Sequence, residues 1–87
     1  MNANNSIKLL YFASLGEQLG LSEEAFPLTQ ACSVQQLCEQ LSERGPQWKE
    51  LLGATKIKCA VNHTISNQQQ QIKPNDEVAF FPPVTGG

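Results

Sequence analysis

The chain has 87 residues, of which 40% are hydrophobic and 16% charged, and this composition predicts one small globular domain rather than a disordered chain. Its formal net charge is −2 with only six Lys and Arg residues, which argues against a protein that binds nucleic acid through many phosphate contacts. No apolar run approaches the roughly 20 residues that span a bilayer, and the polar first residues lack the order of a signal peptide. We therefore expect a cytoplasmic protein that binds no membrane and no nucleic acid.

The first third of the chain predicts a strand, a short helix and a second strand. Residues 6–12 are almost continuously apolar, as in a central strand. Ser14 and Glu17 have the spacing of a capping box, which predicts that a short helix begins there. Residues 23–28 are less apolar and include Pro27, which cannot donate a ladder hydrogen bond, so we expect a strand near a sheet edge.

The strongest helical pattern begins at Ser33, which has the spacing of a second capping box with Gln36. Apolar residues then recur at positions i, i+3, i+4 and i+7 on one helical face: Val34, Leu37, Cys38 and Leu41. Gly45 and Pro46 break this helix, and Pro46 suits the first turn of another short helix.

The second half of the chain predicts mainly strands and turns. Residues 57–61 alternate between apolar and polar side chains, which is typical of a half-buried strand. Residues 62–63 are typical of a turn, after which residues 64–65 are expected to pair back. The glutamines at 68–71 predict a solvated loop. Residues 77–81 predict the last strand, which the following prolines end by removing backbone donors.

The order of these elements predicts an α+β fold, in which a mixed sheet packs against helices on one face and leaves its other face partly open. The first and last strands are the most apolar, so we expect them side by side at the centre. This element order resembles the β-grasp of ubiquitin-like proteins. We expect residues 1–81 to form this domain, with residues 1–6 as a polar extension, and residues 82–87 to form an extended C-terminal tail.

The sequence contains no ordinary catalytic set. His63 is the only histidine and lies in a predicted turn, so we expect it to face solvent. Glu23 and Glu24 are neighbours on a predicted strand, so they point to opposite faces and cannot act as a carboxylate pair.

The cysteines are an odd and scattered set, unlike a disulfide framework or a group of metal ligands. We interpret them as reduced thiols in the core, and we expect no metal site. They are Cys32, Cys38 and Cys59.

The C-terminal segment combines stiffness with a lack of side chains. Pro82 and Pro83 hold the chain extended as it leaves the last strand. Gly86 and Gly87 have no Cβ, so their backbone can enter a tunnel too narrow for any side chain. The α-carboxylate of Gly87 would then be a reactive group at the end of an arm. A frayed terminus is the alternative, but such a terminus needs no prolines to direct it.

Three segments carry a resemblance to a known family: DEVAFFPPVTGG at 76–87, IKLLYFA at 7–13 and AVN at 60–62. They resemble the C-terminus, the first strand and the middle strand with its turn in the small subunits of molybdopterin synthase, the sulfur carriers of molybdenum cofactor synthesis. The likeness extends over nearly the whole chain from Ile7. The polar extension and the glutamines at 68–71 depart from the family pattern.

The resemblance implies a sulfur-transfer chemistry at the C-terminus. An ATP-dependent activating enzyme would adenylate Gly87, and a sulfur donor would convert the acyl-adenylate to a thiocarboxylate. The tail would enter the large, catalytic subunit and give its sulfur to cyclic pyranopterin monophosphate, with two carriers used per dithiolene. The small subunit would be non-catalytic alone and bind no cofactor, because the activating enzyme uses the ATP. Two small and two large subunits would form a heterotetramer.

The resemblance also implies roles for single residues. Gly87 would carry the sulfur, and Gly86 would permit entry to both enzymes' active sites. The rest of the inserted tail would be Thr85, Val84, Pro83 and Pro82. Phe81 and Ile65 match positions that pack against the large subunit. Because Phe80 and Phe81 point to opposite faces of a strand, we expect Phe80 in the core and Phe81 on the outside.

Three other functions stay open. The first is the related carrier of thiamine-thiazole synthesis, which shares the chemistry but delivers sulfur to a different acceptor. The second is a ubiquitin-like modifier that joins its C-terminus to lysines. The third is a binding module with an incidental tail.

Overall fold

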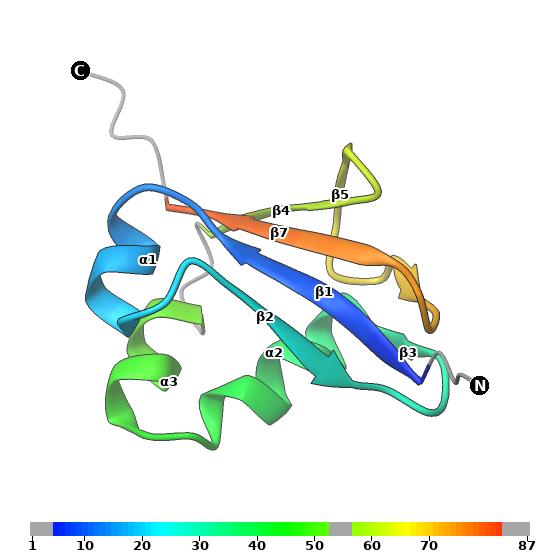
Figure 1. The fold of residues 1–87 in the computed structure, drawn as a ribbon, viewed down its shortest axis with the longest axis horizontal. Helices are drawn as coiled ribbons and strands as arrows, with labels where there is room; N and C mark the ends of the chain where they lie inside the picture. Colours follow the sequence, from blue (N-terminus) through cyan, green and yellow to red (C-terminus); the bar gives the residue numbers. More distant parts are fainter. Residues whose placement is uncertain (1–4, 53–56, 83–87) are drawn as a thin grey trace.

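The computed structural model describes residues 5–52 and 57–82, and Figure 1 shows a twisted sheet with the helices gathered along one side of it. The elements are β1 (Ser6–Tyr11), α1 (Ser14–Leu19), β2 (Glu23–Pro27), β3 (Cys32–Ser33), α2 (Val34–Ser42), α3 (Pro46–Leu52), β4 (Lys58–Val61), β5 (Thr64–Ser66), β6 (Gln71–Ile72) and β7 (Glu77–Phe81). No helix within these described ranges is long and apolar enough to span a membrane.

The main sheet has five strands in the order β2-β1-β7-β4-β5. Strands β1 and β7 lie parallel to each other in its interior, while the β1–β2, β4–β7 and β4–β5 pairs are antiparallel. The central placement of the first and last strands and the edge placement of β2 are therefore confirmed. This mixed sheet with helices on one face confirms the predicted α+β, β-grasp fold. The domain boundary after residue 81 stays a prediction.

The core lies between the sheet and the helices. Helix α2 buries the whole apolar face that its sequence predicted, and its capping box between Ser33 and Gln36 is present. Residues of β1 and β7 form the sheet side of the core, Leu15 of α1 adds to its helical side, and Phe80 is fully buried in it. The largest fully buried side chains are Phe80, Ile7, Leu9, Leu15, Leu37, Leu41, Leu52, Ile72, Val34 and Val78.

The predicted capping box at Ser14 is wrong. Helix α1 begins at Ser14 itself, so Ala13 occupies the cap position and no side chain caps the helix. The first amide groups of α1 instead donate to backbone oxygens, from Leu15 to Phe12 at 3.1 Å and from Gly16 to Ala13 at 3.2 Å. The serine hydroxyl is therefore not needed as an acceptor, because the chain turns tightly enough for carbonyl groups to reach the helix.

The glutamines at 68–71 are more than a solvated loop. Their side chains are exposed, as predicted, but Gln71 begins β6, which pairs with β3 in a small second sheet. The backbone oxygens of Gln68 and Gln70 each accept a hydrogen bond from the first turn of α2, at 3.0 Å. The loop therefore satisfies helix amide groups that would otherwise lack partners. A strand of two residues carries no periodicity, so the sequence could not reveal β3 or β6.

Candidate functional site

The two phenylalanines at the end of β7 have different surroundings. Phe80 is fully buried and stacks on Tyr11, with the ring centres 6.0 Å apart. Phe81 is half-buried, and because side chains alternate along a strand, it lies on the face opposite to Phe80, the face that the helices do not cover and that we call the open face. The structure therefore places Phe81 on the outside, where the sequence predicted it.

Phe81 has an aromatic neighbour, Phe12, that was not among the predicted site residues. The ring of Phe12 stacks on that of Phe81 with centres 5.0 Å apart and an angle of 5° between the planes. Phe12 directly follows β1 and is 44% exposed. The signal that could have revealed it is the pairing of β1 with β7: in a parallel pair, residues that end neighbouring strands on one face lie side by side.

Ile65 lies on the same open face but at some distance from the two rings. It pairs with Ala60 of β4, which in turn pairs with Ala79 of β7, so these three side chains form one row across the face. Ile65 is 69% exposed, whereas the two alanines are 6% exposed. Phe81 is two residues beyond Ala79 on the same face. The structure thus brings Phe81 and Ile65 to one surface, with β4 between them.

Pro82 follows Phe81 and is half-buried. The other predicted tail residues lie outside the described residues: Pro83, Val84, Thr85, Gly86 and Gly87.

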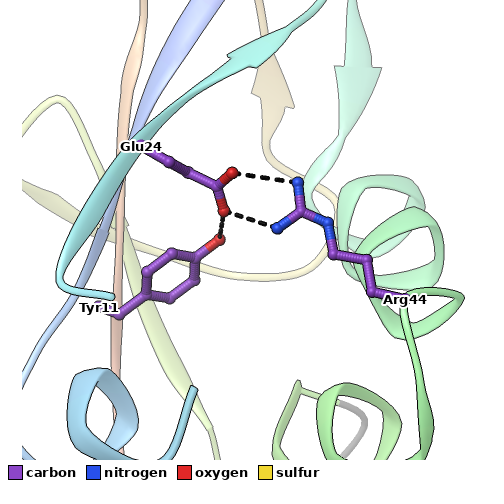
Figure 2. Close-up of polar contacts among 3 residues, drawn as sticks. All are labelled: Tyr11, Glu24 and Arg44. Carbon is purple, nitrogen blue, oxygen red and sulfur yellow. Dashed lines mark hydrogen bonds and ion pairs between the residues drawn. The ribbon is translucent and has the colours of Figure 1, made fainter. Parts of the chain in front are cut away.

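A polar cluster lies on the opposite, helix-covered side of the sheet (Figure 2). The carboxylate of Glu24 accepts two hydrogen bonds from the Arg44 guanidinium, at 2.7 and 3.1 Å, and a third from the Tyr11 hydroxyl at 2.7 Å. Burial acts to raise the pKa of Glu24, but the bonds from Arg44 and Tyr11 outweigh it, and the pKa is lowered. Burial, and then the bond to Glu24, raise the pKa of Tyr11. Every partner is engaged, so this cluster joins elements rather than offering a free acid or base.

The other titratable side chains that the sequence offered as catalytic candidates are the neighbours Glu23 and Glu24, and His63. Glu23 pairs with Leu10 and Glu24 with Leu9, so the two carboxylates do lie on opposite faces. The His63 side chain is 84% exposed and lies 3.7 Å from Glu77.

All three cysteines are free and buried, and burial raises the pKa of each thiol. Within the part of the chain that the structure describes, no three His, Cys, Asp or Glu side chains gather as a metal site. Among residues 5–52 and 57–82, the candidate site that the sequence predicted and the structure brings to one surface is the pair Phe81 and Ile65 on the open face.

The fold and this surface define a small ubiquitin-like protein, and comparison with known proteins specifies its family. The model of the ThiS family matches residues 9–87. The molybdopterin synthase sulfur carrier subunit of Escherichia coli is 38% identical over 85 residues, which cover 93% of this chain and 99% of that protein. The protein of that name from Haemophilus influenzae is 34% identical with the same coverage.

A solved structure agrees with this assignment. The molybdopterin converting factor, subunit 1, of Pyrococcus furiosus superposes with a TM-score of 0.76 at 29% identity and covers 91% of this chain and 98% of that one. The chain belongs to the ThiS family.

Proposed function

We propose that this chain is the sulfur carrier subunit of a molybdopterin synthase and that Gly87 carries the sulfur. The observation that supports this most directly is the similarity to sulfur carrier subunits of that enzyme, at 34% and 38% identity over nearly the full length of both proteins. The FFPPVTGG ending begins in β7, a central strand of the sheet, and its prolines and glycines suit the extended tail that the proposal requires.

The chemistry begins with a poor electrophile. A carboxylate with an ordinary pKa of about 3.3–3.7 is ionised at neutral pH and resists attack. An oxygen of the Gly87 carboxylate attacks the α-phosphorus of ATP on an activating enzyme, and pyrophosphate leaves. A sulfide-level donor then attacks the acyl carbon, AMP leaves with the carboxyl oxygen, and a thiocarboxylate results. Its ionised sulfur is the nucleophile of the next reaction.

The second reaction takes place in the large, catalytic subunit of the synthase. The tail 82–87 inserts there, and the sulfur of Gly87 passes to cyclic pyranopterin monophosphate, with two carriers used per dithiolene. The domain supplies no acid or base. It supplies a tethered and oriented sulfur atom, and its contribution to rate is the effective concentration that tethering produces.

The open face is the surface by which the domain docks on the large subunit in this proposal. Phe81 and Ile65 are apolar side chains with substantial exposure on one face, which suits the centre of a protein interface. Two small and two large subunits make up the complex.

The test is the intact mass of the protein from cells with an active pathway, followed by fragmentation of the C-terminal peptide. We expect added mass on Gly87 that a thiol alkylator traps. Exchange of oxygen for sulfur and ordinary oxidation add nearly the same mass, so the position of the change decides. An unmodified Gly87 after incubation with the activating enzyme, ATP and a sulfur donor contradicts the proposal.

Two further experiments separate this function from the alternatives. Exchange of acceptor enzymes in a reconstituted assay distinguishes it from sulfur delivery in thiazole synthesis. Conjugates of higher mass in a cell lysate would indicate a protein modifier.

A further inference from the structure

We propose that Phe12 is a positioning residue: a strained corner at Ala13 holds its ring against Phe81, and this contact sets the direction in which the chain leaves β7. The consequence of this contact for sulfur delivery rests on the proposed function, whereas the contact of Phe12 with Phe81 and its effect on the chain do not.

The end of β1 is fixed to the end of β7 by two contacts. The Phe12 amide donates to the Phe80 oxygen at 3.1 Å, which extends the parallel pairing of β1 and β7 by one residue. The Phe12 ring then stacks on Phe81, with centres 5.0 Å apart. Phe12, which directly follows β1, therefore holds both the backbone of Phe80 and the side chain of Phe81.

The corner that follows Phe12 is strained. Ala13 has φ 54° and ψ −133°, a conformation outside the main allowed regions for a residue with a Cβ. Residues in such sparsely populated conformations persist only where their surroundings determine them fully, and they cluster at functional sites.

Close packing of α1 keeps this corner in place. A Cβ on Gly16 would lie 2.8 Å from the Tyr11 oxygen and 3.3 Å from the Leu21 oxygen, so the helix touches the end of β1 directly. The Gly16 amide also donates back to the Ala13 oxygen at 3.2 Å. These contacts leave the chain little freedom to relax the corner by moving α1 away.

Burial of Phe12 does not account for the strain, because this side chain is 44% exposed. The strained conformation of Ala13 instead serves to hold the Phe12 ring against Phe81. Phe81 also pairs with Lys58 of β4, but Pro82 has no amide hydrogen and so cannot donate a further ladder bond to either neighbouring strand. The stacked ring is then the last contact from β1 that fixes Phe81 before the tail begins. Sulfur transfer depends on the orientation of the reacting group. If the direction of the chain after Phe81 is less fixed, the rate of sulfur transfer falls even where binding to the large subunit is intact.

The first measurement uses the isolated chain and requires no sulfur chemistry. Residual dipolar couplings of the Val84–Gly87 amide groups are compared between the wild type, Phe12→Ala and Phe12→Tyr. We expect Phe12→Ala to change these couplings while those of α2 stay constant, and Phe12→Tyr, which retains a stacking ring, to restore them. Ile65→Ala is the matched control, because it shortens an exposed side chain on the same face that lies beyond β4, and it should leave the tail couplings unchanged.

The second measurement separates positioning from direct contact with the large subunit. In single turnover with saturating large subunit, we expect Phe12→Ala to lower the rate of sulfur transfer about tenfold and to weaken binding by less than about threefold. In a Phe81→Ala background the same substitution should have little further effect, because the residue through which it acts is gone. A weaker affinity with an unchanged single-turnover rate overturns the proposal, as do unchanged tail couplings in Phe12→Ala. If the wild type transfers no sulfur, the proposed function fails and the couplings alone decide the role of Phe12.

Discussion

Arg44 and Glu24, 20 positions apart in the sequence, form a two-pronged ion pair with hydrogen bonds of 2.7 and 3.1 Å (Figure 2). The pair connects the edge strand β2 to the turn that follows α2. The Arg44 guanidinium also lies 4.6 Å from the centre of the Trp48 ring, a cation–π distance. One arginine thus ties an edge strand to the helical layer.

Glu24→Gln should destabilise the fold at pH 7 by on the order of 1 kcal/mol, because it replaces a charged acceptor in a partly exposed pair. The pKa of Glu24 is lowered in the folded protein, so its charge stabilises the fold above the ordinary value of 4.5 and this contribution is lost as the pH falls through the lowered folded-state pKa. Urea unfolding between pH 7 and pH 2 should show the gap between variant and wild type closing in that acid range.

Glu23→Gln is the control for this experiment, since Glu23 is exposed and lies on the opposite face of the same strand. Its stability should match that of the wild type at pH 7. An equal loss of stability in both variants would mean that the net charge of the protein, rather than the ion pair of Glu24 with Arg44, stabilises the fold.

Gly16 lies within α1 and Gly20 directly follows it, and we expect alanine to cost more stability at Gly16. A Cβ at Gly16 would meet two backbone oxygens at 2.8 and 3.3 Å, which cannot move without shifting α1 or β1, so we expect a loss of about 2 kcal/mol or more. A Cβ at Gly20 would meet open space, and only the positive φ of 84° opposes it, for about 1 kcal/mol. Chemical denaturation of both variants measures the difference, and a larger loss at Gly20 would contradict the packing of α1 described here.

The parts of the fold that the sequence predicted well are those with strong local signals. Helix α2 has both a capping box and a full apolar face, and β7 combines an apolar run with a proline at its end. The start of α1 was predicted wrongly because Ser14 offers a plausible cap, whereas the tight turn before the helix lets the oxygens of Phe12 and Ala13 accept from the first helix amide groups. This turn requires a positive φ at Ala13, which an alanine rarely adopts, so the residue type did not indicate it.

The candidate site likewise has features that local patterns predict and features that depend on how the strands pair. Alternation along β7 separates Phe80 from Phe81 without knowledge of the fold, and the expected pairing of the first and last strands is enough to bring Phe12 near. The stack of Phe12 on Phe81 and the strain at Ala13 depend on the register of that pairing. Register is a property of two segments 66 or more residues apart along the chain, so neither segment encodes it alone.

The Cys38 thiol should resist alkylation while the protein is folded. Burial, followed by the nearby Cys59 and Glu39, raises the pKa of Cys38 to about 12, so very little of the reactive thiolate is present at pH 8. Peptide mass spectrometry after iodoacetamide treatment should find Cys38 unmodified in buffer and modified in urea. Labelling in buffer at the rate of a free thiol would show that the site opens without unfolding.

Removal of residues 86–87 should abolish sulfur transfer and leave the fold intact. Among the described residues the buried core extends no further than Phe80, so the free energy of unfolding should stay within about 0.5 kcal/mol of the wild type. Transfer is measured as molybdopterin formation with the large subunit and the activating enzyme. A truncated chain that still supports formation would exclude Gly87 as the carrier.

Alanine substitution at Phe80 and at Phe81 should separate stability from partner binding. Phe80 is fully buried, so Phe80→Ala should cost about 3–5 kcal/mol of stability through the cavity that it leaves. Phe81 is half-buried on the open face, so Phe81→Ala should cost about 1 kcal/mol of stability, yet weaken binding to the large subunit by up to about 2 kcal/mol, or roughly thirtyfold. Thermal unfolding and a binding titration measure the two effects on the same samples. The opposite pattern, in which Phe81→Ala lowers the melting temperature strongly and leaves affinity unchanged, would place Phe81 among the structural residues and remove it from the docking surface.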